Sequence, residues 1–334
     1  MKAIQLRSPG GLDRLVHGDI PDAPEPGPGE IRIRVAASSL NYHDYAVVTG
    51  SIKTSDGRIP MSDGAGEVVA VGDGVTGFAV GDLAVSTFFP KWLAGGPVDG
   101  GFSGVPGDGQ DGFAREYVTA PATSFTRAPR GYTAAEAATL TCAGVTAWRA
   151  LVPDGPLIAG QWVLVQGTGG VSIFALQLAK ARGARVIATS SSDAKLERLT
   201  GMGADHVINY RSVEKWGSKA REISGGGVDH VVEIGGAGTL PQSISAARSG
   251  GHIALIGILA GLQGEVPTAL LMGKQIRLQG LTVGSRQDQL DLIAAIEANG
   301  IRPVIDRHFP LAQLAGAFAY QDSGAHFGKI CVDI

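Results

Sequence analysis

A glycine-rich segment that joins an apolar run to a helix-like run places the strongest constraint on how this chain can fold. Trp162–Gln166 predicts a buried strand, the glycine-rich segment follows directly, and Val171–Arg182 predicts a helix. This order is typical of a dinucleotide-binding βαβ unit, in which backbone N–H groups at the helix start face a pyrophosphate. The candidate pyrophosphate-binding residues are Gly167, Thr168, Gly169, Gly170 and Val171. Ser172 stands where the motif has its third glycine, so an ordinary strand–helix turn is the alternative.

The sequence around this segment alternates between strand and helix patterns. Thr133–Ala150 and Asp193–Gly201 favour helices. Further strands are predicted at Arg185–Thr189, His206–Ile208, Val228–Ile234, His252–Ile256 and Ile276–Val283. Such alternation indicates an α/β fold with a doubly wound parallel sheet.

The first 125 residues have a different texture, with short strands separated by glycine and proline turns. Strands are predicted at Glu30–Ala36, Gly66–Gly72 and Glu116–Val118, which suggests a small β-barrel or sandwich-like domain. Near the C-terminus, helices at Asp288–Asn299 and Leu311–Tyr320 and a strand at Lys329–Ile334 could pack back on this domain.

The end of the second predicted strand indicates which dinucleotide binds. An NAD site usually has an acidic residue about 20 residues after the glycine loop, but Ser190 occupies that slot. Ser190, Ser191, Ser192 and Lys195 could instead receive a 2′-phosphate through charge-assisted hydrogen bonds, which favours NADP over NAD. Asp193 argues the other way, although the first turn of a helix also favours an acid there. The alternative role for the serines is to cap that helix.

Net charge and hydropathy limit the classes of partner that the protein is expected to bind. The net charge is −3 and the pI about 6.2, so nothing favours nucleic acid or an anionic membrane as a partner. No apolar run reaches the ~18 residues that span a bilayer, and the N-terminus lacks a signal-peptide pattern. We therefore expect a cytoplasmic protein.

A set of short motifs, in order along nearly the whole chain, resembles the zinc-independent, quinone-oxidoreductase-like branch of the medium-chain dehydrogenase/reductase superfamily. Beside the glycine loop the markers are Asn41-Tyr42-His43-Asp44, Asp63-Gly64-Ala65-Gly66-Glu67-Val68, Gly81-Asp82, Cys142-Ala143-Gly144-Val145-Thr146-Ala147, Gly203-Ala204-Asp205-His206-Val207-Ile208-Asn209-Tyr210 and Gly328-Lys329. The resemblance implies a GroES-like β-rich catalytic domain (residues 1–126 and 287–334) with an inserted Rossmann domain (residues 127–286). It also implies a homodimer joined near Ile276–Val283.

The same resemblance indicates whether the chain can bind zinc. Zinc alcohol dehydrogenases of this superfamily carry a cysteine and a His-Glu pair where this chain has Asn41 and Ser62-Asp63, so only Cys142 remains of the usual ligands. One thiol cannot hold a zinc ion that takes three protein ligands and water. The four cysteines of the structural zinc lobe are replaced by a glycine-rich segment between Thr87 and Phe113. We expect no zinc.

The resemblance also assigns cofactor contacts by position. Asn41 and Thr146 would lie near the nicotinamide, and Tyr210 beside the adenine ribose and its 2′-phosphate. Ile256, Gly257 and Ile258 would follow a strand at the edge of the sheet where such folds bind ligands. Lys329 is a further candidate. For each, packing or turn formation is the alternative.

Without a Lewis acid, hydride transfer from NADPH suits reactive acceptors such as quinones, enones and similar activated carbonyls. The product oxyanion or enolate then needs a proton, and Tyr42 or water could supply it. His43 and Asp44 are interpreted as structural, and Phe88, Phe89 and Trp92 as a lid over the acceptor or as anchors of the glycine-rich segment. One alternative is an NADP-dependent alcohol dehydrogenase or carbonyl reductase that takes an aldehyde. The other is a non-catalytic NADPH-binding sensor or structural protein.

Overall fold

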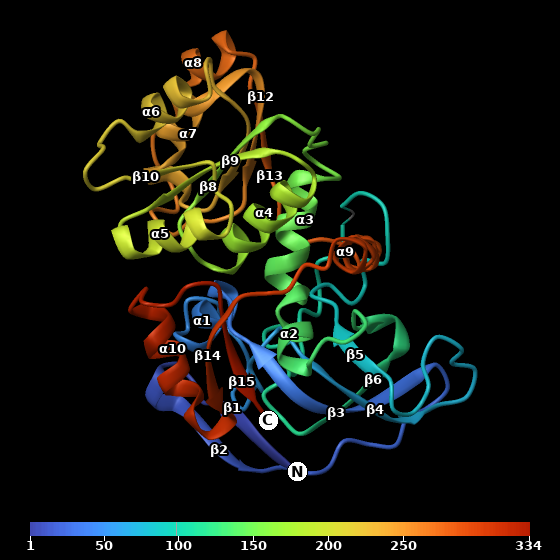
Figure 1. Cartoon of the computed structure of the whole chain (residues 1–334). Helices are drawn as coiled ribbons and strands as arrows, with labels where there is room; N and C mark the ends of the chain where they lie inside the picture. Colours follow the sequence, from blue (N-terminus) through green and yellow to red (C-terminus); the bar gives the residue numbers. More distant parts are fainter. Residues whose placement is uncertain (98) are drawn as a thin grey trace. The chain divides into compact units, whose positions relative to one another are not determined.

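The predicted strand–helix alternation forms a six-stranded parallel sheet in the computed structural model, which describes residues 1–97 and 99–334 (Figure 1). The strand order is β10-β9-β8-β11-β12-β13, so the direction of winding reverses between β8 and β11. This is the order of a doubly wound dinucleotide-binding sheet, and it confirms the predicted α/β fold class. The strands are β8 (Trp162–Gln166), β9 (Arg185–Ser190), β10 (His206–Asn209), β11 (Val228–Glu233), β12 (Ala247–Leu255) and β13 (Arg277–Gly280).

Apolar strands explain why this sheet forms. Leu164, Ile187, Val231 and Ile253, one from each of the four central strands, are fully buried in one cluster. Strands of a parallel sheet that are covered on both faces have such continuous apolar runs. The connecting helices are α4 (Gly170–Ala181), α5 (Asp193–Gly201), α6 (Trp216–Ile223), α7 (Leu240–Ala246) and α8 (Thr268–Gly273).

The β-rich part of the chain is built from both ends of the sequence. A seven-stranded sheet has the order β14-β15-β3-β4-β5-β7, with β6 paired to β3, and β1 and β2 form a separate pair. β15 runs antiparallel to β3, with Cys331 opposite Ser39, so the C-terminal strand does pack on the N-terminal part. The strands are β1 (Lys2–Leu6), β2 (Leu15–Asp19), β3 (Glu30–Ser39), β4 (Ala65–Val71), β5 (Leu83–Ser86), β6 (Tyr117–Pro121), β7 (Phe125–Arg127), β14 (Ile305–Pro310) and β15 (Lys329–Asp333).

The helix predicted at Thr133–Ala150 is interrupted. A five-residue π-helical turn, Leu140–Gly144, separates α2 (Ala134–Ala138) from α3 (Val145–Leu151). The side chain of Thr141 in this turn donates a hydrogen bond to the Ser86 carbonyl at 2.8 Å, which gives the wider turn a tertiary partner. The remaining helices are α1 (Tyr42–Val48), α9 (Arg286–Asn299) and α10 (Leu314–Asp322).

The chain divides into two units. The first comprises Met1–Val145 and Gly284–Ile334, and the second Thr146–Val283. Residues 127–145 and 284–286, predicted to belong with the Rossmann domain, belong to the first unit. In the longer of these segments, α2 packs against β3, β4 and β5. Throughout the described part of the chain, no helix has both the length and the apolar character that a bilayer crossing requires.

Candidate functional site

The glycine loop joins β8 to α4 through a left-handed glycine and an open helix start. Gly167 follows β8 directly, adopts a φ of +71°, and donates its backbone N–H to Thr189 at 2.9 Å. A side chain with a Cβ is strained at that φ, which explains glycine there. Gly169 caps α4, and a Cβ built on it would meet no atom within 4 Å. The loop therefore presents an open backbone surface at a helix N-terminus.

Ser172 replaces the third glycine of the motif without disturbing it. Its side chain is fully buried, and its Oγ donates to the Gln166 carbonyl at 2.5 Å. The hydroxyl thus fastens the first turn of α4 to the last residue of β8, so the imperfect motif keeps the close helix–strand packing that it needs.

The serines and the lysine predicted to receive a 2′-phosphate lie at the C-terminal end of β9 and at the start of α5. Ser190 pairs in register with Asn209, and Ser192 caps α5 by accepting from the Lys195 backbone N–H at 3.4 Å. Asp193 is in the first turn of α5, where its carboxylate accepts from the Asn209 amide at 2.7 Å. Ser192 therefore caps α5, and all four residues remain phosphate candidates.

The other predicted cofactor residues in the second unit are placed as follows. Tyr210 is 43% exposed and donates its backbone N–H to the Ser190 carbonyl at 3.2 Å. Ile256, Gly257 and Ile258 follow the last residue of β12, and a Cβ on Gly257 would lie 2.1 Å from the Ile234 carbonyl oxygen. Thr146 is buried on α3.

A buried polar cluster in the first unit surrounds Asn41. The Lys329 ammonium, on β15, donates to Asn41 Oδ1 and to the Leu40 carbonyl, both at 2.6 Å. Its Nζ also lies 3.5 Å from Asp63 Oδ2, which accepts from Ser39 Oγ at 2.5 Å. The side chains of Lys329 and Asp63 are 4% and 0% exposed. Asn41, Lys329 and Asp63 therefore form one connected group.

The charge balance of this cluster follows from burial. Burial raises the pKa of Asp63 to about 6, and the Lys329 ammonium opposes that rise. An ammonium this deeply buried needs the carboxylate and carbonyl oxygens that surround it. Sequence reasoning placed Lys329 beside the cofactor and did not connect it to Asp63. The pairing joins positions 266 residues apart, so no local pattern signals it.

The residues beside Asn41 have structural partners. Asp44 accepts from the backbone N–H groups of Asn41 at 3.0 Å and Ser62 at 2.7 Å, so it ties the start of α1 to the segment before β4. Burial disfavours the charged form of His43, but Asp108, 2.8 Å from its Nε2, and Asp44 outweigh it and raise the pKa of His43 to about 9. Tyr42, in contrast, is 49% exposed.

The donor set at the positions of the family's zinc markers does not fit a zinc ion. Asn41 offers an amide whose Oδ1 accepts from an ammonium and whose Nδ2 donates to Ser62 Oγ at 3.3 Å. Zinc prefers thiolate, imidazole and carboxylate ligands, and a cation 2.6 Å from the amide oxygen would repel it. Cys142 lies in the π-helical turn and supplies only one thiol. The zinc-free expectation itself stays a prediction.

The first three aromatic residues of the glycine-rich segment are buried, whereas Phe102 is 39% exposed. Phe88, Phe89 and Trp92 are 6%, 5% and 2% exposed, and the ring centroids of Phe88 and Phe89 are 4.9 Å apart. The Trp92 carbonyl accepts from the backbone N–H of Arg286 at 2.9 Å. These contacts favour the anchoring role over a lid.

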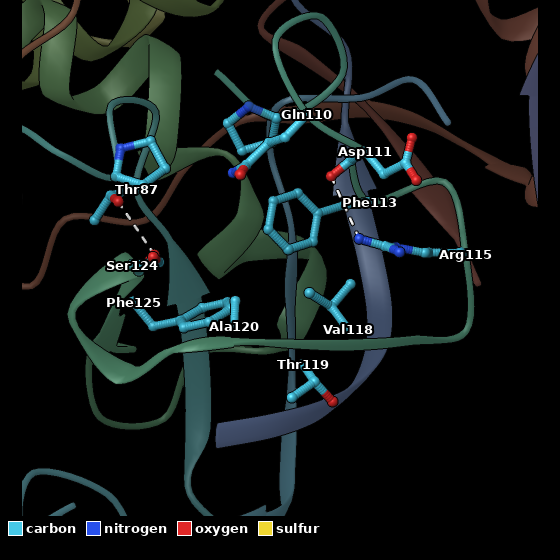
Figure 2. Close-up of a pocket in the computed structure, with 12 residues that line it drawn as sticks. Thr87, Gln110, Asp111, Phe113, Arg115, Val118, Thr119, Ala120, Ser124 and Phe125 are labelled. Carbon is cyan, nitrogen blue, oxygen red and sulfur yellow. Dashed lines mark hydrogen bonds between the residues drawn. The ribbon is translucent and has the colours of Figure 1, made fainter. Parts of the chain in front are cut away.

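A cavity of about 180 Å³ opens elsewhere in the first unit, beside β6 and β7 (Figure 2). The Phe113 and Phe125 rings line it, and Arg115 reaches towards it while its Nη2 donates to the Asp111 carbonyl at 3.3 Å. None of the residues predicted for hydride transfer lines this cavity, so it is a separate feature of the first unit.

Each of the two units matches a known protein family over part of its length. Residues 27–130 match the family described as alcohol dehydrogenase GroES-like domain, and residues 170–298 match the zinc-binding dehydrogenase family. A zinc-type alcohol dehydrogenase-like protein of Schizosaccharomyces pombe is 40% identical, with 97% of this chain and 96% of that protein covered.

Solved structures are similar over the whole chain. An NAD-dependent alcohol dehydrogenase is 32% identical with a TM-score of 0.91, and both chains are fully covered. A mycobacterial protein in complex with NADPH is 28% identical with a TM-score of 0.83, again over both full chains. A crotonyl-CoA carboxylase/reductase in complex with NADP is 25% identical with a TM-score of 0.87, covering 100% of this chain and 95% of that one.

These matches confirm the predicted superfamily, whereas the quinone-oxidoreductase-like branch stays a prediction. The glycine loop, the order of the sheet strands and the similar proteins all point to the same superfamily. The chain belongs to the zinc-type alcohol dehydrogenase-like proteins of the medium-chain dehydrogenase/reductase superfamily and is an NAD(P)-dependent oxidoreductase.

Proposed function

We propose that this protein is an NADPH-dependent reductase that works without zinc and passes hydride to a quinone, an enone or a similar activated carbonyl acceptor. The observation that carries the proposal is the buried Lys329–Asn41–Asp63 cluster at the positions of the family's zinc markers. The family model named for zinc binding covers residues 170–298 and includes none of these positions. Acceptors that take hydride without a Lewis acid suit such a site.

The chain's own residues would orient the reactants and supply a proton. NADPH, when bound, supplies the hydride. The Lys329 ammonium fixes the Asn41 amide, which can then orient the nicotinamide or the acceptor carbonyl. The oxyanion or enolate that hydride transfer creates needs a proton, and the half-exposed Tyr42 phenol can donate one, with water as the competing donor.

A preference for NADPH over NADH is part of the proposal. Ser190 and Ser191 offer hydroxyls and Lys195 a cation at the end of β9, where an NAD site would carry an acid. Asp193, the nearby acid, is already hydrogen-bonded to the Asn209 amide. The relative solved with NADPH and the one solved with NADP support this preference, and the NAD-dependent relative argues against it.

A second candidate is an NADP-dependent alcohol dehydrogenase or carbonyl reductase. The names of the relatives favour it more than they favour the quinone or enone reductase, because alcohol dehydrogenase recurs among them. The crotonyl-CoA carboxylase/reductase relative, which is named for an activated alkene, favours the first candidate. A non-catalytic NADPH-binding protein is the third possibility, and turnover with any acceptor excludes it.

One acceptor panel separates these candidates. Purified protein is assayed with NADPH and with NADH against a quinone, an enone and an aldehyde, before and after treatment with a chelator. We expect kcat/KM for the quinone or enone to exceed that for the aldehyde by about tenfold or more, with no loss after chelation. A higher value for the aldehyde supports the second candidate. Stoichiometric zinc that is lost together with activity refutes the metal-free proposal.

We also propose that the protein is a homodimer joined at β13, the edge strand of the parallel sheet. An edge strand has unpaired backbone groups that a second copy can pair with. Apolar side chains are exposed in the preceding segment, where Leu259, Leu262 and Met272 are 57%, 80% and 77% exposed. Burying these side chains against a second copy would favour association.

A further inference from the structure

A buried carboxylate lies at the centre of the parallel sheet, where the direction of winding reverses. Glu233 is the last residue of β11 and is fully buried. Among the described residues, no lysine, arginine or histidine forms an ion pair with it, so hydrogen bonds alone offset its desolvation.

The groups that bond the Glu233 carboxylate all donate to it, and Ser243 Oγ also accepts from Gln166 Nε2 at 2.7 Å. Oε1 accepts from the backbone N–H groups of Gly235 at 2.7 Å and Gly236 at 3.0 Å, and from Thr239 Oγ1 at 2.6 Å. Oε2 accepts from Gln166 Nε2 at 2.8 Å and from Ser243 Oγ. An ionised carboxylate accepts only, so it matches this set, whereas an amide would place its NH₂ against either the Gln166 NH₂ or the backbone N–H groups of Gly235 and Gly236.

One of these contacts reaches the glycine loop. Gln166 is the last residue of β8 and directly precedes Gly167. Its Nε2 donates to Glu233, and its Oε1 accepts from the backbone N–H of Ile234 at 3.2 Å. The Gln166 amide therefore joins the C-terminal ends of β8 and β11, the two strands between which this fold binds a dinucleotide.

Other contacts reach the second loop that is predicted to touch the cofactor. The Glu233 backbone carbonyl accepts from the N–H groups of Ile256 at 2.8 Å and Gly257 at 3.2 Å. The segment after β11, held by the carboxylate, bonds the same loop, because Gly235 accepts from Ala260 at 2.7 Å. Residue 233 thus connects both loops.

We propose that Glu233 is a positioning residue of the dinucleotide site, whose carboxylate fixes the loop after β8 and the loop after β12 relative to each other. The proposal rests on the dinucleotide binding proposed above. The residue touches no substrate in this role; it sets the spacing of the backbone groups that do.

The test exchanges the two side chains. In Glu233→Gln, the new NH₂ group faces the Gln166 NH₂. The Gln166 amide cannot flip to avoid this contact, because the flip would break its hydrogen bond with the Ile234 N–H. We expect the Kd for NADPH to rise by about tenfold or more. In the double variant Gln166→Glu/Glu233→Gln, the carboxylate at position 166 can accept from the new NH₂ group at position 233 and from the Ile234 N–H. The amide oxygen at position 233 can still accept from Gly235, Gly236 and Thr239. We expect its Kd to return to within about threefold of the unaltered protein.

NADPH fluorescence titration gives the Kd, and circular dichroism and Tm report folding. Glu222→Gln, on the exposed surface of α6, is the matched control. The proposal is overturned if Glu233→Gln folds and binds NADPH as the unaltered protein does, or if the double variant folds and stays as weak as the single one. If Glu233→Gln does not fold, the double variant decides alone. Absence of NADPH binding by the unaltered protein would instead refute the proposed function.

Discussion

Two buried histidines in the second unit predict how stability depends on pH. His230 on β11 and His252 on β12 are 5% and 4% exposed, with ring centroids 5.9 Å apart. The pKa of each is lowered to about 4, mainly by burial; nearby arginines, Arg277 among them, contribute to both shifts, and Asp229 opposes the shift at His230. Arg277 Nε lies 2.9 Å from His252 Nδ1. Both rings are therefore neutral in the folded protein at neutral pH.

The sign and size of the effect follow from linkage. Each folded-state pKa lies below the ordinary value of 6.5, so the unfolded chain binds protons first as the pH falls. Stability is complete above about pH 6.5 and declines towards about pH 4. The difference between the unfolded-state and folded-state pKa values corresponds to a loss of about 3 kcal/mol in the free energy of unfolding per histidine once the pH is below both pKa values. At pH 5 the loss is about 2 kcal/mol per histidine.

The double variant His230→Gln/His252→Asn isolates this effect. Gln and Asn keep a neutral polar atom near Gln161 and Arg277, the present hydrogen-bond partners, and neither titrates. Urea unfolding at pH 7.5 and pH 5.0 gives the loss of unfolding free energy on acidification. We expect that loss to be smaller in the double variant by about 2 to 4 kcal/mol. His17→Gln, on the exposed strand β2, is the control. An equal loss in the double variant and the unaltered protein would refute the reasoning.

Three further predictions concern the cofactor, the proton and the interface. Gly257→Ala places a Cβ 2.1 Å from the Ile234 carbonyl oxygen, so steady-state kinetics should show a KM for NADPH raised about tenfold, and an unchanged KM would contradict the placement of this loop. Tyr42→Phe should lower kcat/KM about tenfold without changing Tm if the phenol donates the proton, and a loss under about threefold eliminates that role. Leu262→Glu puts a charge on an 80% exposed apolar side chain, so light scattering should show the monomer mass; an unchanged dimer mass would exclude this interface.

Local patterns predicted the elements whose ends are set locally. Trp162–Gln166 and Asp193–Gly201 match their predicted bounds, because a glycine ends the first and the Ser192 cap begins the second. β12 begins at Ala247 instead of His252, since a pairing of Ala247 with Val228 extends it through residues that read as a turn. β14 (Ile305–Pro310) was not predicted at all, and its polar sequence becomes a strand by pairing with β15.

The candidate site also contains both kinds of feature: some are set by local sequence and others by the pairing of distant segments. The glycine loop and the serines after β9 were visible because strand, turn and helix are contiguous in the sequence. The contact of Asp63 with Lys329 depends on the pairing of β15 with β3, and the contact of Glu233 with Gln166 depends on the order of the parallel strands. Contacts between distant positions are fixed by topology, which one sequence does not display.

The position of β15 between β14 and β3 sets the order in which the protein can acquire its structure during synthesis. The second unit is one continuous stretch, Thr146–Val283, and can complete its sheet while the ribosome is still adding the remaining residues. β3, by contrast, waits for a neighbouring strand that is translated almost 300 residues later, and Asn41 waits with it for the lysine that fixes its amide. A nascent chain can thus hold a complete second unit while the last 51 residues, which include β15 and Lys329, are still being added.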